Sequence, residues 1–208
     1  MNNPEFSFNG KFNLNPFFAT LKGESEKLNL ANFFNSESIF VQLLKTEIFN
    51  SKNIDFEFNL NSNAINNYLN FKNINFNLKI KEGLIDIDDT SFEWKKSSDF
   101  KIYNSLIFIK DGELILDGKL EVNIENYNEI YKFLLTPKNY RSKFNKIDLG
   151  FSYNFNQRST KLKDIKIDGK MNNELNTLLG NVNFKENNLQ NKIYFKNLLN
   201  KAVKAYAG

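Results

Sequence analysis

Apolar and polar residues alternate along much of this chain, which is the pattern of a β-strand with one buried face. The clearest row is "LILDGKLEVNI" (114–124), in which every second residue is apolar apart from a glycine at position 118. Comparable rows lie within residues 6–14, 56–60, 74–80, 85–87, 100–108, 149–155 and 162–167. The pattern predicts a mainly β protein.

Glycines punctuate these rows in two ways. Gly83 in "KEGL" and Gly112 in "KDGEL" stand between rows, where they can supply the positive φ of a tight hairpin. Gly10, Gly118 and Gly169 each precede a lysine, and the first two occupy inward places within their rows. Because a missing side chain lets a sheet bend or bulge, we expect these three to mark points of strong curvature, and Gly118→Val to flatten or destabilise the sheet.

Short helices are expected between the strands, each after a residue able to cap it. The first covers 37–49 and the second 62–69, where Ile65 and Leu69 would face inward. The first helix would bury the residues at three- and four-residue spacing, which are Ile39, Phe40, Leu43, Leu44 and Ile48.

The C-terminal half predicts three further helices. Residues 126–135 would bury Tyr127, Tyr131 and Leu134, and residues 172–180 would end at Gly180 as a C-cap. In 196–208 an apolar stripe opposes lysines, which favours a helix docking on a sheet over one lying on a membrane surface. The stripe consists of Leu198, Leu199, Ala202, Val203 and Tyr206.

Length, composition and charge limit the classes of function that this chain could have. The chain has 208 residues, 41% of them hydrophobic, and no linker rich in Pro, Gly or Ser, which predicts a single domain over 1–208. The net charge of +4 is spread without long runs of one sign, so a nucleic-acid partner is not expected. The sequence contains neither a candidate export signal nor 18 consecutive apolar residues.

Little catalytic chemistry is available. The chain has no histidine and no cysteine, which removes Ser-His and Cys-His arrangements and the usual metal ligands. The only dense acidic group is "DIDDT", with Asp86, Asp88 and Asp89, and alternation places Asp86 and Asp88 on a solvated face near a turn. We therefore expect no catalytic residues, no metal site and no cofactor, with a carboxylate-based glycosidase as the least favoured alternative.

Several segments together resemble a known family, namely "GKFNLNPFFATLKGESEKLNLANFF", "LKIKEGLIDIDDTSFEW", "FKIYNSLIFIKDGELILDGKLEVNI" and "IKIDGK". Their glycine-punctuated amphipathic rows are similar to the C-terminal region of AsmA-like proteins of the bacterial cell envelope, to which TamB is related. The residues that match the family's recurring apolar and glycine-containing motifs are Leu28, Leu30 and Phe33, then Gly83 to Ile87, Gly112 to Leu116 and Gly118 to Val122.

The resemblance implies a long, strongly curved antiparallel sheet, a half-open trough with an apolar inside, accompanied by a few short helices and the C-terminal amphipathic helix. It also implies phospholipid traffic between inner and outer membranes, outer-membrane biogenesis and a place on the periplasmic side of the inner membrane. The family's N-terminal membrane anchor is not in this sequence, so the resemblance implies that the chain is the C-terminal part of a longer protein.

The residues and the resemblance support three functional hypotheses. In the first, the trough shields phospholipid acyl chains; its structural alternative is that the same apolar face packs on another sheet or on the helices. In the second, exposed strand edges make the domain a scaffold for other envelope proteins. An enzyme is the third. The expected lipid-lining residues are Phe6, Phe8, Phe12, Phe56, Phe58, Phe76, Leu78, Leu114, Leu116, Leu120 and Val122.

Overall fold

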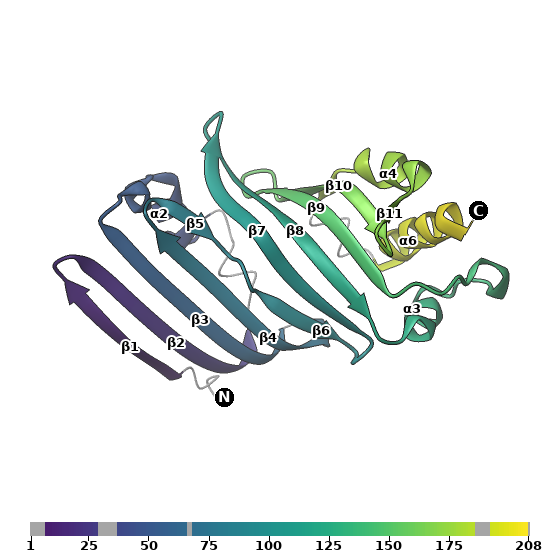
Figure 1. Ribbon diagram of the computed structural model, residues 1–208, viewed down its shortest axis with the longest axis horizontal. Helices are drawn as coiled ribbons and strands as arrows, with labels where there is room; N and C mark the ends of the chain where they lie inside the picture. The colour runs from purple at the N-terminus through teal and green to yellow at the C-terminus, as the bar shows by residue number, and fades with distance from the viewer. Residues whose placement is uncertain (1–6, 29–36, 66–67, 186–191, 208) are drawn as a thin grey trace.

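The computed structural model describes residues 7–28, 37–65, 68–185 and 192–207. Its main feature is one curved 12-stranded sheet, as expected for a mainly β protein (Figure 1). The strands are β1 (Ser7–Leu14), β2 (Phe17–Leu28), β3 (Ile54–Ile65), β4 (Tyr68–Lys81), β5 (Leu84–Asp86), β6 (Ser91–Trp94), β7 (Ser98–Lys110), β8 (Glu113–Ile124), β9 (Lys146–Asn154), β10 (Ser159–Ile167), β11 (Lys170–Met171) and β12 (Phe184–Lys185).

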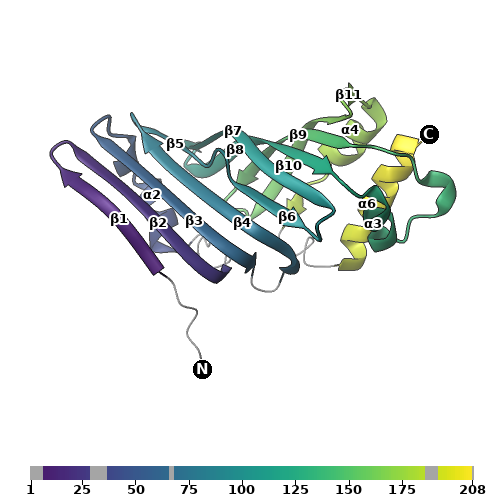
Figure 2. The same cartoon turned by 60° about the horizontal axis from the view of Figure 1, so that its bottom comes forward.

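Helices and short 3-10 turns connect and cover the strands. They are α2 (Ile39–Lys45), η1 (Ile48–Asn50), α3 (Tyr127–Leu134), η2 (Lys138–Tyr140), α4 (Asn173–Gly180) and α6 (Lys192–Ala207). Figures 1 and 2 show α3, α4 and α6 gathered at one end of the sheet, whereas β1 forms the other end.

The strand order is β1-β2-β3-β4-β5-β7-β8-β9-β10-β11, with β6 between β4 and β7, and β12 on β10. Neighbours are antiparallel except β2 and β3, which run parallel from Phe17↔Ile54 to Leu28↔Ile65. The sheet is therefore mixed and not purely antiparallel as expected. A parallel pair needs a crossover, and the segment between β2 and β3 contains α2 and η1.

Two sequence patterns were read wrongly. The described part of 62–69 is strand and not helix, because β3 continues to Ile65 and β4 begins at Tyr68. Ile65 is buried as expected, whereas the burial of Leu69 lies outside what the structure describes. Ser62, which resembled a cap, instead lies buried and donates a hydrogen bond to the Ala64 carbonyl, 3.0 Å away. β2 was missed because several of its inward positions are small or polar, such as Ala19, Gly23 and Ser25, which hides the alternation.

The hairpin turns follow the glycine signals. Gly83 and Gly112 have φ of 82° and 76°, in the turns between β4 and β5 and between β7 and β8. Gly169 has φ of 77° and lies in the turn between β10 and β11. This corrects the expectation that Gly169 bends a strand, because it turns the chain between two strands instead.

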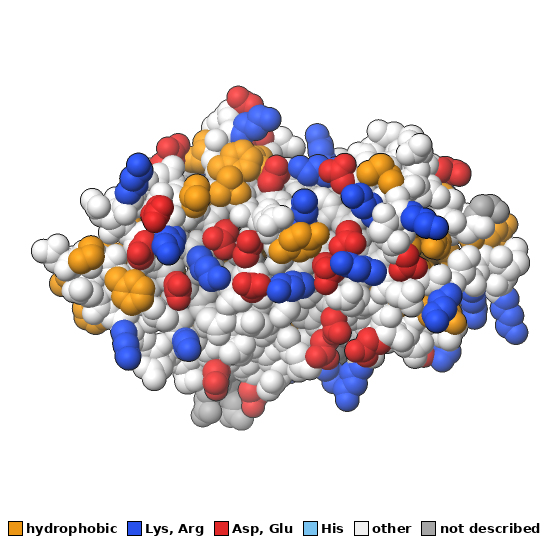
Figure 3. Space-filling model, viewed as in Figure 1, with side chains coloured by type: hydrophobic (Ala, Val, Ile, Leu, Met, Phe, Trp, Pro, Cys, Tyr) orange, Lys and Arg blue, Asp and Glu red, His pale blue; other side chains and the backbone are white. Residues whose placement is uncertain are grey.

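Register places the apolar rows on one face, which we call the inner face. Across the first four strands Gly23 pairs with Phe8 and Leu60, and Leu60 pairs with Phe76. On β7 and β8, Ile107 pairs with Leu116. On the opposite, outer face, positive and negative side chains are interspersed, with a few hydrophobic groups between them (Figure 3).

Two hydrophobic cores form on the inner face. The first lies under α2 and contains Val41, Leu44, Leu60 and Leu78 among its buried residues. α2 also contacts β8, so it reaches across the trough. We call these residues and their neighbours the first core.

The second core lies where α3, α4 and α6 cover β9 and β10. Tyr131 of α3, Leu175 of α4 and Leu198 of α6 are buried there with Ile165 and Ile167 of β10. The predicted helices over 126–135 and the C-terminal stripe are thereby confirmed, although α6 packs on α3 and α4 as well as on the sheet's core. α4 ends at Gly180 with Asn181 as its cap, so Gly180 is the last helical residue and not the cap.

Two hydrogen bonds connect α6 to the end of α3 and the residues that follow it. Asn200 of α6 accepts a hydrogen bond from the Thr136 hydroxyl at 2.6 Å and donates one to the Leu134 carbonyl. Thr136 is 1% exposed, so its hydroxyl needs this partner. The helices therefore close this end of the trough both by apolar burial and by polar contacts.

Candidate functional site

The candidate site is the inner face of β1 and the start of β2, where the apolar row continues and, among the described residues, no helix packs on it. Phe8, Phe12, Leu14 and Phe17 are 57%, 75%, 74% and 38% exposed, and we call these four the apolar rim. Register keeps them on one face, since Phe8 pairs with Gly23, Phe12 with Ala19 and Leu14 with Phe17.

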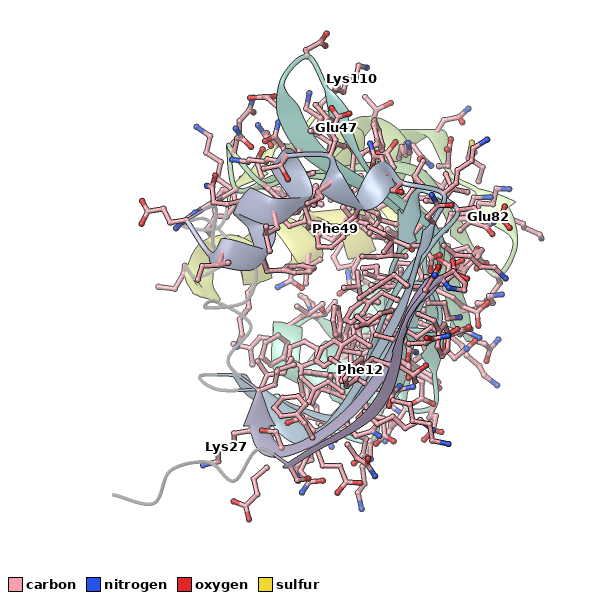
Figure 4. All side chains as sticks on the ribbon, turned by 90° about the vertical axis from the view of Figure 1, so that its left-hand side faces the viewer. Phe12, Lys27, Glu47, Phe49, Glu82 and Lys110 are labelled. Carbon is pink, nitrogen blue, oxygen red and sulfur yellow. The ribbon has the colours of Figure 1, made fainter. Side chains whose placement is uncertain are left out.

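Aromatic rings connect the rim to the first core. Phe8 stacks on Phe58 with ring centroids 6.3 Å apart, and Phe58 meets Phe76 edge-on at 6.2 Å. Seen from the β1 end, Phe12 lies on the inner side of the curved sheet, below the turn that carries Phe49 (Figure 4). The rim is thus the open continuation of the buried interior.

Glycines make room for the aromatic rings. A Cβ at Gly23 would lie 2.7 Å from the Phe8 ring, and a Cβ at Gly118 would lie 2.9 Å from that of Phe151. In both places the glycine pairs directly with the phenylalanine on the next strand. Gly23 was not among the glycines expected to matter, because the small or polar inward residues of β2 hide its alternating row.

The register of β7 shifts beside Gly118. The shift lies between Tyr103 and Leu106, which pair with Lys119 and Asp117 on either side of the glycine. A side chain at Gly10 would collide with Leu21 on β2. Gly10 and Gly118 are thus strand residues at close contacts, and their role in sheet curvature stays a prediction.

The structure divides the expected lining residues into three groups. Phe8 and Phe12 are exposed, Phe56 and Leu120 are partly buried, and Phe6 lies outside the described residues. The others pack in the protein interior with no more than 8% exposure. These are Phe58, Phe76, Leu78, Leu114, Leu116 and Val122. For this last group the inner face packs against other side chains, so an open groove along the whole trough is not what the structure contains.

The first helix buries only part of the predicted stripe: Leu44 is buried and Phe40 packs on the first core as expected, whereas the other three predicted residues are exposed. It packs through Val41 and Leu44, whereas Ile39 and Leu43 are 80% and 40% exposed. Ile48 in η1 is also exposed. The helix begins after Ser38, whose hydroxyl accepts from the Val41 amide, and has seven residues, which is too short to bury the wider stripe that the spacing suggested.

The acidic triplet has structural partners. Asp88 accepts hydrogen bonds from the amide and hydroxyl of Ser105, at 2.7 and 2.6 Å, and so ties the end of β5 to the register shift in β7. Asp89 pairs with Lys101 at 2.9 Å, and this contact, with a smaller contribution from Lys79, lowers its pKa. Partial burial raises the pKa of Asp86.

Ion pairs continue across the outer face. Lys146 lies 2.7 Å from Glu121 and 3.2 Å from Asp148, and the contact with Lys146 lowers the pKa of Glu121. The pair with Glu121 links β8 with β9, the pair with Asp148 lies within β9, and both leave the outer face hydrophilic. Within the described residues, no group of three or more His, Cys, Asp or Glu side chains could hold a metal ion.

Two hollows occur elsewhere, and neither coincides with the rim. The larger, about 580 Å³, lies at the ends of β2, β3 and β4 and is lined by Asn, Ser and Glu side chains. A smaller one of about 190 Å³ lies between η1, β5 and the β7–β8 hairpin, and its lining is mainly apolar. The polar lining of the larger hollow does not suit an acyl chain.

Comparisons with known proteins return no match to a family model, to a curated protein or to a solved structure. Over the part of the chain that the structure describes, no helix is long and apolar enough to cross a membrane.

Proposed function

We propose that this chain is a non-enzymatic cell-envelope module that shelters lipid acyl chains at the apolar rim. The observation that carries the proposal is the exposed row of Phe8, Phe12, Leu14 and Phe17, which runs into the first core through Phe58. Each methylene that leaves water for such a surface is worth roughly 0.8 kcal/mol. An extended apolar ligand therefore fits this row better than a polar one.

The two ends of the trough decide how a ligand would enter. The end at α3, α4 and α6 is filled by the second core, whereas the rim is open. An acyl chain would enter at the rim and lie against the inner face of β1 and β2, without sliding through the whole molecule. The module then acts as the closed end of a lipid-binding surface.

The resemblance to AsmA-like proteins supports the biological setting that we propose. In that setting the cargo is the acyl part of a phospholipid, transport runs between inner and outer membranes, and the module lies on the periplasmic side of the inner membrane. If the chain is part of a longer protein, membrane association would come from an N-terminal anchor like that of the family.

Lipid binding can be tested on the purified chain. Mass spectrometry after mild extraction should detect co-purified phospholipid, and a fluorescent long-chain fatty acid should bind. The double variant Phe12→Asn, Leu14→Asn should weaken fatty-acid binding at least ~10-fold, since full burial of one such side chain is worth about 1.5–3 kcal/mol.

The matched control is Phe18→Asn. Phe18 is 41% exposed on the neighbouring strand but faces outward, opposite Asn13 and Asp55. Its loss should leave fatty-acid binding unchanged. Protein free of lipid that does not bind the fatty acid, or equal effects of the two variants, would count against the proposal.

A second candidate function is a scaffold that binds another envelope protein by strand addition. It is favoured by β1, whose eight residues are all exposed at the end of the sheet. An added strand would take its hydrogen bonds from the outer edge of β1.

A further inference from the structure

β1 is an edge strand with little of the usual protection against pairing, since its one charged residue, Lys11, faces outward. It is the first strand in the sheet order, and every residue from Ser7 to Leu14 is exposed. Natural edge strands commonly carry inward charges, prolines or bulges that prevent pairing. Here the inward positions are Phe8, Gly10, Phe12 and Leu14, and the register with β2 is regular throughout.

The opposite edge of the sheet is protected. β11 and β12 each have two residues and pair with only part of β10, and α4 packs on β10 as well. Short edge strands and a covering helix are both known ways of preventing strand addition. Among the described residues the molecule therefore has one long unprotected edge.

We propose that two copies of this chain pair through β1, antiparallel and about a twofold axis at Gly10. With one usable edge per copy, such pairing closes after two copies and does not continue into a fibre. The inner faces of both copies then lie on the same side of a continuous sheet. This proposal does not rest on lipid binding.

The sequence of β1 is self-complementary in this register. Phe8 of each copy faces Phe12 of the other, and Lys11 faces Asn9, which places an apolar pair inward and a polar pair outward. A register centred on Lys11 would instead bring two lysines directly opposite each other, which is unfavourable. The only charged residue of β1 thus disfavours the register at Lys11, and the facing Phe8 and Phe12 favour the register at Gly10.

The contact is small, which sets its strength. Pairing over residues 7–13 spans about 24 Å of strand. The surface area that it buries is therefore smaller than that of a standard protein–protein interface. It would bury much of Phe8 and Phe12, which are 57% and 75% exposed in one copy. We therefore expect a reversible dimer whose population depends on protein concentration.

Cysteine cross-linking tests the register, because the chain has no cysteine of its own. Asn9→Cys and Lys11→Cys proteins, mixed and oxidised without added lipid, should form the mixed disulfide in preference to the Lys11→Cys homodimer. Sedimentation of the unmodified chain should show a monomer–dimer equilibrium. Phe12→Lys, an inward charge on the edge, should weaken that equilibrium at least ~10-fold, whereas Phe18→Lys on the outer face should leave it unchanged.

Other outcomes overturn the proposal. A chain that stays monomeric up to about 1 mM, or that binds only the strand of a different protein, has no self-pairing edge. Efficient cross-linking of Asn9→Cys to itself, in a chain that keeps Lys11, would contradict the register at Gly10. Equal weakening by Phe12→Lys and Phe18→Lys would show that association occurs elsewhere on the surface.

Discussion

Both ends of the trough are built from strands with alternating apolar residues, but the inward residues are buried at one end and exposed at the other. At the C-terminal end the inward residues of β9 and β10 meet three helices, and Ile165 and Ile167 are buried. At the β1 end the inward Phe12 and Leu14 meet solvent. Alternation therefore specifies which side chains share a face, whereas the segments that connect the strands specify whether that face becomes a core.

The strongest test of this comparison is the same substitution at each end. Phe144 is 5% exposed and contacts Tyr131 and Tyr206 edge-on, with centroids 6.0 and 6.2 Å away. Phe144→Ala should lower the free energy of unfolding by about 3–5 kcal/mol, because it leaves a cavity in the second core.

Phe12→Ala should change that free energy by no more than about 0.5 kcal/mol, as expected for an exposed side chain. Urea denaturation of both variants measures the difference. A comparable loss from Phe12→Ala would mean that the rim is covered in solution, and dilution would then distinguish a dimer from a bound lipid.

The sequence predicted the strands correctly where large apolar residues occupy the inward positions of an alternating row. β4 and β8 were read from such rows, and the buried side of α3 from the spacing of Tyr131 and Leu134. β2 was missed because Gly23 and Ser25 occupy its inward places. The ring of Phe8 occupies the space beside Gly23, so this inward position has no side chain and the alternation of β2 is interrupted there.

The candidate site was predicted only in part, for a related reason. Phe8 and Phe76 occupy equivalent inward positions in similar rows, yet one is 57% exposed and the other 4%. Exposure depends on α2, which packs over the first core and not over β1. The position of α2 depends on the crossover between two parallel strands, which local sequence patterns do not specify.

A smaller effect is expected at the boundary between the two cores. Leu114, Leu116 and Phe151 belong to the first core, and Leu149 packs on the second, so Gly118 lies near the division. Gly118→Val should lower the free energy of unfolding by about 1–3 kcal/mol, because its side chain would overlap the Phe151 ring.

Thermal or urea unfolding measures this loss. Phe151→Leu should recover part of it if the ring is the obstacle, as a double-mutant cycle would show. Gly118→Val with undiminished stability would mean that the strands separate easily there, and the two ends would then be less rigidly joined than the packing indicates.

The smallest of the predicted losses in the buried interior concerns a single hydroxyl in the closed end. Tyr131 is fully buried and its hydroxyl donates a 2.6 Å hydrogen bond to the Ser142 carbonyl; burial raises its pKa to about 12. The unfolded chain has a tyrosine pKa of about 10, so the neutral phenol stabilises the fold fully below pH ~10, and this stabilisation is lost as the pH rises through about 12. Tyr131→Phe should lower the free energy of unfolding by about 1 kcal/mol at neutral pH.

The same variant should also lose less stability than the unmodified chain between pH ~10 and ~12, since it has no phenol to ionise at this position. Urea denaturation at a series of pH values measures both the loss of stability at neutral pH and its change at high pH. The unmodified chain, measured at each pH under the same conditions, is the reference. If Tyr131→Phe follows it at high pH, water reaches the hydroxyl of Tyr131, and the end of the trough closed by α3 and α6 is more open than its packing indicates.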